Sequence, residues 1–332
     1  MRKGRALLLF LGLALLIWLV WKIGAVEIWK HAFALGWGLI PLILGEGLAQ
    51  AIHTLGWRCC LMDPQRSLPF LHLFRVRMAG CAINCFTPTA LLGGDATKAL
   101  LLASNHQRPP AVAGMLRGKL CFAAAHVLFV LLGSWFILRR FTLPRGLWVA
   151  MLLGGTLAAA GVLGFLLIQR QGQLGRVLRW LLARGAGGRA LQNATGEITE
   201  VDEALKAGFR DRSGDLFRAV GWHLLGLSVG ILQTGLFLRL LNYPVSAASA
   251  TAACSLGMWF DLLTFPMPMN MGTWEATRIV VFNAMGCSPV FGVTYALALR
   301  FGHLLWAAFG LANFILLILK AEALTPGPLS NS

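Results

Sequence analysis

Long runs of apolar residues, separated by short polar segments, dominate the chain. A membrane-spanning helix needs about 20 predominantly apolar residues. Six segments meet that requirement; they lie at about 6–26, 33–56, 119–138, 146–168, 217–238 and 289–319. Each should be helical, because lipid offers no partner for the polar groups of an open backbone. The pattern predicts an all-α polytopic membrane protein with about six full spans.

Two further apolar stretches, about 67–104 and 247–286, are too long for one span and are interrupted in the middle. The interruptions contain Pro88, Gly93 and Gly94 in the first stretch, and Pro266, Pro268 and Gly272 in the second. Proline removes a helical hydrogen bond, and glycine permits a sharp reversal. Each stretch is therefore predicted to be a broken, re-entrant hairpin of two half-helices.

The two hairpins carry the same pattern when the chain is shifted by 180 residues. A proline is followed by an acid, then by Ala-Thr and a cation, and finally by a second proline, over 88–109 and again over 268–289. Three pairs of charged residues recur in this way: Asp95 with Glu275, Lys98 with Arg278 and, at an offset of 183, Arg117 with Arg300.

Three predicted spans separate the hairpins, so the second hairpin enters from the opposite face of the membrane. The repeat is then inverted within a single membrane domain, with a first unit at 33–138 and a second at 217–319. Inverted repeats with broken helices are typical of alternating-access transporters.

The composition supports this assignment and gives it an orientation. Hydrophobic residues make up 57% of the chain and charged residues 13%, yet the net charge is +16. With the hairpins returning to the face they enter from, fifteen Lys and Arg lie on the N-terminal side and six on the other. The positive-inside rule then places the N-terminus in the cytoplasm. The basic excess is explained by the anionic membrane surface, without nucleic acid.

The one substantial polar segment, 169–215, is predicted to form cytoplasmic amphipathic helices. Its first part combines arginines with leucines and contains no acid, which is typical of an interfacial helix with a basic face. Its second part places Ile198, Val201, Leu205 and Phe209 at helical spacing among acids. The segment is too short to be a catalytic soluble domain.

Both hairpins resemble the flippase-type membrane domain of lysylphosphatidylglycerol synthases and its stand-alone, hopanoid-cluster or uncharacterised relatives. The first matches the family motif from Pro88 through Gly93, Gly94 and Asp95 to Lys98, and the second from Pro266 through Pro268, Gly272 and Glu275 to Arg278. The second break departs from the family pattern, because Met269, Asn270 and Met271 replace glycines. The resemblance covers about 5–320 and implies lipid handling in the bacterial inner membrane. We expect no aminoacyl-transferase domain in this sequence, so the resemblance implies no lysyl transfer.

The repeated charges allow two interpretations. Asp95 and Glu275 begin the second half-helix of each hairpin, where they could cap the helix and pair with the cation three residues on. However, a charge at membrane depth costs about 2.5–3.5 kcal/mol and usually faces a polar cavity. In the second interpretation, the cations bind the phosphate of a lipid, and the two acids hold those cations in position. The cations are Lys98, Arg117, Arg278 and Arg300.

Two further intramembrane acids, Glu46 and Asp261, have no counterpart in the repeat. They are candidates for proton coupling or headgroup contact, or for a buried hydrogen bond to a neighbour such as Gln50 or His53. The seven cysteines show no CxxC pair, and the histidines no metal-ligand spacing. We therefore expect free thiols, no metal and no cofactor.

The function that these patterns favour is translocation of an amphipathic lipid, anionic or of the polyisoprenoid or hopanoid type, between the leaflets of the inner membrane. One alternative is a lipid-binding accessory subunit of a lipid or glycan biosynthesis enzyme, docked through 169–215. Another is a membrane enzyme that modifies lipids, although no catalytic grouping is visible. The sequence predicts neither the lipid nor an oligomeric state.

Overall fold

The computed structural model describes residues 26, 30, 33, 35–86, 92–103, 108–140, 145–173, 175–176, 180, 195–211, 213–264 and 272–324. The regular elements in these ranges are all helical, as predicted. They are η1 (Gly36–Gly38), α3 (Leu39–Cys60), η2 (Gln65–Ser67), α4 (Phe70–Phe86), α5 (Leu92–Ala103), α6 (Arg108–Arg140), α7 (Arg145–Gln171), α10 (Thr195–Asp211), α11 (Ser213–Leu240), α12 (Ala247–Thr264), α13 (Thr273–Ala284) and α14 (Pro289–Leu324).

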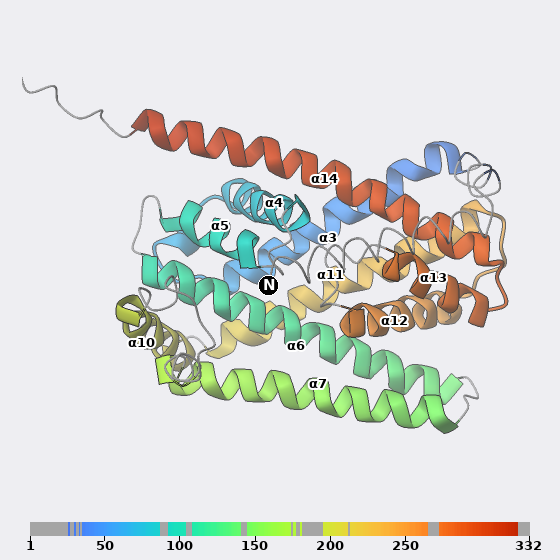
Figure 1. Cartoon of the computed structure of the whole chain (residues 1–332), viewed down its shortest axis with the longest axis horizontal. Helices are drawn as coiled ribbons and strands as arrows, with labels where there is room; N and C mark the ends of the chain where they lie inside the picture. The colour runs from blue at the N-terminus through green and yellow to red at the C-terminus, as the bar shows by residue number, and fades with distance from the viewer. Residues whose placement is uncertain are drawn as a thin grey trace, which may run out of the picture.

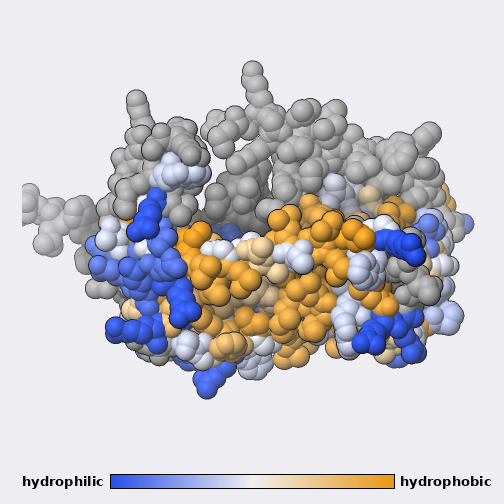
Figure 2. Space-filling view, turned by 90° about the horizontal axis from the view of Figure 1, so that it is seen from below, coloured by the Kyte–Doolittle hydropathy of each residue, from blue (hydrophilic) through white to orange (hydrophobic). Residues whose placement is uncertain are grey.

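Five helical segments in the described ranges are long and apolar enough to cross a membrane. They are Gly36–Cys60, Arg108–Arg140, Met151–Gln171, Ser213–Leu240 and Pro289–Leu319, and they contain or overlap five of the six predicted spans. The remaining predicted span, 6–26, lies almost wholly outside the described residues. Figure 2 shows a broad apolar band with hydrophilic residues at both ends, as expected of a multi-pass membrane protein.

Both predicted hairpins are present as pairs of half-helices, α4 with α5 and α12 with α13. The breaks between them, 87–91 and 265–271, lie outside the described residues together with Pro88, Pro266 and Pro268. Gly272 stands at the start of α13 with φ of 70°, a left-handed conformation that suits glycine.

The predicted position of Gly93 and Gly94 in the first break is wrong. Both lie inside the first turn of α5. Gly94 permits close packing, because a methyl group there would overlap the carbonyl oxygen of Gly80 on α4. The backbone N–H of Gly94 also donates to Asn84 Oδ1 at 2.8 Å. The two half-helices are therefore in contact through their backbones.

The helix that follows each hairpin begins at the second proline of the repeat. Pro109 is the second residue of α6, and Pro289 is the first residue of α14. Proline suits the first turn of a helix, where its missing N–H would have no intrahelical partner. This start makes α6 eleven residues longer at its N-terminus than the predicted span at 119–138.

The hairpins lie toward opposite ends of the bundle, on either side of the paired helices α3 and α11 (Figure 1). At one end Trp57 of α3 packs with Leu73 of α4 and Leu102 of α5. At the other end Leu42 of α3 packs with Phe237 of α11 and Phe282 of α13. The long helix α14 packs against α3, α4 and α13, and so connects the two hairpins.

The second predicted amphipathic helix is confirmed as α10. Its apolar residues Val201, Leu205 and Phe209 are buried, and they pack with Ala113 and Leu120 of α6. The helix therefore covers the end of α6 that lies next to the first hairpin. Of the first predicted amphipathic helix, Arg170 belongs to α7, and most of the remainder lies outside the described residues.

The contact between Gly80 and Gly94 yields a stability prediction. Gly94→Ala should lower the free energy of unfolding by about 1–3 kcal/mol, because the added methyl group meets backbone and cannot be relieved by a rotamer change. Thermal unfolding of the purified protein in detergent measures this. Gly161→Ala on α7 is the control, since nothing lies within 4 Å of a methyl group there. Equal unfolding temperatures for the two variants would contradict the prediction.

Candidate functional site

In the first hairpin, the acid at the start of α5 binds two cations. The side chain of Asp95 is only 12% exposed and accepts hydrogen bonds from Lys98 Nζ at 3.0 Å and Lys119 Nζ at 2.5 Å. Lys98 lies one turn further along α5, so the predicted pair within the helix is confirmed. Lys119 comes from α6 and was not predicted. The N-terminal position of Asp95 also suits a carboxylate.

In the second hairpin, the predicted pair of Glu275 with Arg278 is wrong. The fully buried carboxylate of Glu275 instead accepts from Arg300 Nε of α14 at 2.6 Å. Arg278 directs both terminal nitrogens to Asp261 of α12, at 2.8 and 2.7 Å. This two-pronged geometry is the strongest that arginine makes with a carboxylate. Because α12 and α13 pack side by side, the cation finds its partner across the hairpin.

The contacts also correct the equivalence of Arg117 and Arg300. Asp95 and Lys119 are 24 residues apart, and Glu275 and Arg300 are 25 apart, so Lys119 corresponds to Arg300. Two residues along a helix are turned by roughly 200°. Arg117 accordingly faces away from the hairpin. It is fully buried, donates to the carbonyl of Cys60 at 3.4 Å, and lies 5.6 Å from the ring centre of Phe209 on α10.

A chain of polar contacts runs between the hairpins through the middle of the bundle. Arg77 of α4 donates to Gln50 Oε1 at 3.2 Å, and Gln50 Nε2 donates to Glu46 Oε1 at 2.8 Å. The other oxygen of Glu46 lies 3.1 Å from His303 Nε2 of α14. The predicted buried hydrogen bond from Gln50 to Glu46 is therefore confirmed, and the carboxylate also reaches α14.

An aromatic ring extends this chain to the second hairpin. The ring centre of Trp274 lies 5.3 Å from that of His303, 5.0 Å from the guanidinium carbon of Arg278 and 5.4 Å from that of Arg300. Cations are attracted to the face of an indole at such distances. Trp274 therefore brings the cations of α13 and α14 together beside the carboxylate network.

Three adjoining cavities lie along this network. The first-hairpin cavity, about 170 Å³, is lined by Arg77, Asn84, Asp95, Lys98 and Lys119 among others. The central cavity, about 310 Å³, includes Glu46, Asn84, Trp274, Arg300 and His303 in its lining. The second-hairpin cavity, about 170 Å³, includes Glu46, Asp261, Trp274, Arg278 and His303. Neighbouring cavities share lining residues, so we call the three together the polar interior.

Comparison with known protein families assigns the chain to one of them. The family described as the lysylphosphatidylglycerol synthase TM region matches residues 6–311. The chain belongs to this family. Membership supports a role related to membrane lipids. Neither a curated protein nor a solved structure gave a match.

In this member of the lysylphosphatidylglycerol synthase TM family, the charges of the first-hairpin cavity do not balance. Three cations, Arg77, Lys98 and Lys119, line it with one carboxylate, that of Asp95. The Nε of Arg77 is buried and has no hydrogen-bond acceptor among the described residues. The cavity is thus suited to an additional anionic group.

Sequence reasoning missed Arg77 and Lys119, although a signal existed for each. Arg77 is a charge inside an apolar half-helix, which by itself marks a residue that faces a polar cavity. Lys119 is 181 residues before Arg300, closer to the 180-residue repeat than Arg117 is. Of the predicted binding residues, all but Arg117 and Glu275 line the polar interior, and Glu275 contacts the cavity-lining residue Arg300.

The part of the chain that is described contains no group of three or more His, Cys, Asp or Glu side chains placed to hold a metal ion. His53 and His223 form a buried pair, with their Nδ1 atoms 3.0 Å apart, and Phe122 packs edge-on against both rings. All seven cysteines are free thiols.

The buried pair of Glu275 and Arg300 yields a test of its energetic role. Arg300→Gln should destabilise the protein by roughly 3–5 kcal/mol, because it leaves the Glu275 carboxylate buried without its cation. Adding Glu275→Gln should recover much of that loss. Thermal unfolding of the two single variants and the double variant measures the coupling.

The matched control is Arg218→Gln. Arg218 also pairs with a carboxylate, that of Asp215 at 3.3 Å, but its side chain is 73% exposed. An exposed pair contributes about 0–1 kcal/mol, so this variant should unfold close to the wild type. Additive effects of the Glu275 and Arg300 substitutions would contradict the assigned pairing.

Proposed function

We propose that the protein translocates an amphipathic lipid with an anionic headgroup between the leaflets of the membrane. The observation that carries this proposal is the first-hairpin cavity, which has three cations and one carboxylate inside an apolar helical bundle. A lipid phosphate would compensate this excess charge. Its apolar tail would stay in contact with the lipid-facing surface of the helices.

Arg77 is the residue best placed to bind the headgroup first. Among the described residues, its hydrogen bond goes to the neutral amide of Gln50, whereas Lys98 and Lys119 already contact Asp95. A guanidinium group binds phosphate through two parallel hydrogen bonds. The incoming phosphate would also draw Lys98 and Lys119 away from the single carboxylate that they share.

The second hairpin would provide the other end of the path. There each cation has its own carboxylate, Arg278 with Asp261 and Arg300 with Glu275. This end would bind the headgroup less strongly and favour its release. The contacts among Glu46, Gln50 and His303 connect the two ends and would supply polar partners for a headgroup in transit.

An inverted repeat would explain how access alternates. The two hairpins carry matched acid–cation pairs to the next long helix and lie toward opposite ends of α3 and α11. Rocking of one unit against the other would open the polar interior first to one leaflet and then to the other. We infer that the end bearing α10 faces the cytoplasm of a bacterial cell, because the positive-inside count favours that side.

The charge of the transported lipid can be identified with purified protein in liposomes. We expect fluorescent phosphatidylglycerol to cross between leaflets faster than fluorescent phosphatidylcholine, measured by dithionite quenching of the outer leaflet. Arg77→Gln should slow the phosphatidylglycerol rate by about tenfold or more, because one charge-assisted hydrogen bond is lost. Asp95 keeps both of its lysines in that variant.

Arg140→Gln is the matched control, since Arg140 is an exposed arginine at the far end of α6. It should translocate lipid at the wild-type rate. The double variant Lys98→Ala with Arg278→Ala should show no translocation, provided that it elutes as a folded species. Wild-type rates in Arg77→Gln, or equal rates for the two lipids, would refute the proposed headgroup site.

A further inference from the structure

A larger cavity lies outside the polar interior, where α6, α7, α10 and α11 meet. Its volume is about 720 Å³, within the range of small-molecule sites in proteins. Its walls are mainly apolar and include Leu120, Ala124, Val162, Leu166, Leu216 and Val220. None of its lining residues also lines one of the three cavities of the polar interior.

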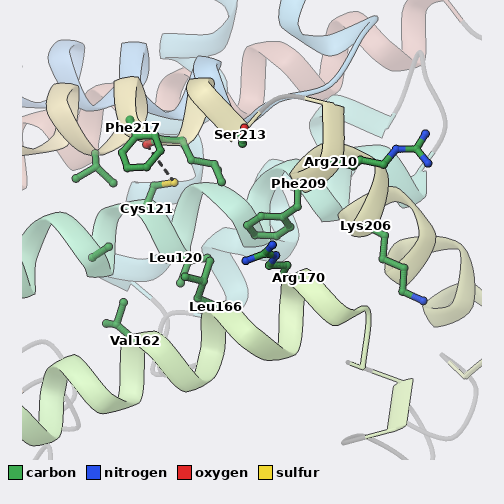
Figure 3. A pocket seen from close by; sticks show the side chains of 13 residues that line it. Leu120, Cys121, Val162, Leu166, Arg170, Lys206, Phe209, Arg210, Ser213 and Phe217 are labelled. Atoms are coloured by element: carbon green, nitrogen blue, oxygen red, sulfur yellow. Dashed lines mark hydrogen bonds between the residues drawn. The ribbon is translucent and has the colours of Figure 1, made fainter.

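Three cations also line this cavity. Arg170 is in the last turn of α7, and Lys206 and Arg210 project from α10. Figure 3 shows the guanidinium group of Arg170 beside the ring of Phe209, with the leucines and Val162 below and to one side. Arg170 and Lys206 form no ion pair with any described residue. Their charges are available to an anionic ligand.

Asp202, which lies one turn before Lys206 on α10, has a different partner. Asp202 is buried and accepts a hydrogen bond from the backbone N–H of Gly175 at 2.9 Å. The stem of Lys206 packs against Gly172, the residue after α7, which brings the lysine to the same end of the helix as Arg170. Asp202 therefore binds the backbone at this end of α7 and pairs with neither Arg170 nor Lys206.

The cavity spans the border between the apolar band and one hydrophilic end of the molecule. Figure 2 shows hydrophilic residues at both ends of the band, and Figure 1 places α10 at one of these ends. A ligand with an apolar tail and an anionic head would place its tail along α6, α7 and α11 and its head at Arg170 and Lys206. Phospholipids have this division of polarity, and basic residues at a membrane surface attract their anionic members.

We propose that this cavity binds an anionic phospholipid, with its phosphate at Arg170 and Lys206. The bound lipid stays in place, is distinct from the transported lipid, and stabilises the packing of α10 on α6 and α7. It fills the apolar space that Phe209 and the opposing leucines leave between these helices. The cavity therefore gives the protein a requirement for anionic lipid that is independent of translocation.

Thermal unfolding in detergent with added phosphatidylglycerol or phosphatidylcholine tests this site. In the wild type, phosphatidylglycerol should raise the unfolding temperature and phosphatidylcholine should not. Arg170→Gln with Lys206→Gln should weaken apparent phosphatidylglycerol binding by about tenfold or more, because two cations are removed. Ala124→Trp should weaken it as well, since the indole fills the apolar part of the cavity while the charges remain.

Two controls match these variants. Arg140→Gln removes an exposed cation at the far end of α6, and Gly161→Leu adds bulk to α7 where the surroundings are open. Both should keep the wild-type response to phosphatidylglycerol. A wild-type response in the Arg170 and Lys206 double variant, or an equal response to both lipids, would overturn the proposed site.

The same variants separate this site from the proposed transport function. The Arg170 and Lys206 double variant should still translocate phosphatidylglycerol in liposomes. Arg77→Gln should lose translocation but keep the unfolding response that depends on the larger cavity. Cross-linking with a photoactivatable phosphatidylglycerol should label α7 and α10 in Arg77→Gln, and loss of that label would contradict two separate sites.

Discussion

Every charge in the interior of this bundle must find a partner, because an unpaired charge in an apolar environment is among the most costly features a protein can contain. The structure meets much of this requirement by pairing the acid at the start of each second half-helix with a cation on the long helix that follows it. Asp95 binds Lys119 of α6, and Glu275 binds Arg300 of α14. The polar interior depends on these two pairs, because they fix each hairpin against the helix beside it.

The buried charges are compensated differently at the two ends of the polar interior. In the second hairpin, two cations have two carboxylates, and Trp274 packs against both guanidinium groups. In the first, Asp95 is shared by two lysines, and Arg77 lines the same cavity with the side-chain amide of Gln50 as its partner among the described residues. The repeated sequence pattern thus supports two sites of unequal charge. That inequality makes the two ends of the polar interior electrostatically different, as two identical sites would not be.

The sequence was sufficient for the helices, for the existence of both hairpins and for most members of the site, because apolar length and repeated charges are local signals. It was not sufficient to predict which charged residues pair with one another. The i, i+3 spacing suggested that Arg278 pairs with Glu275, yet the packing of α12 on α13 offers Asp261 in a better geometry. Similarly, Arg117 and Lys119 differ by two positions, and only the rotation of α6 decides which one faces Asp95. Gly94 was assigned to a break because its contact with Gly80 depends on how α4 and α5 pack, which the sequence alone does not show.

The spacing of the hairpin pairs has a consequence for how the chain is made. Each acid is followed by its cation within 24 or 25 residues, a distance that one hairpin arm and the start of the next helix can cover. During synthesis, the carboxylate and its counter-charge therefore reach the insertion machinery almost together. Each half of the protein can enter the bilayer with its own acid already neutralised, before the other half has left the ribosome.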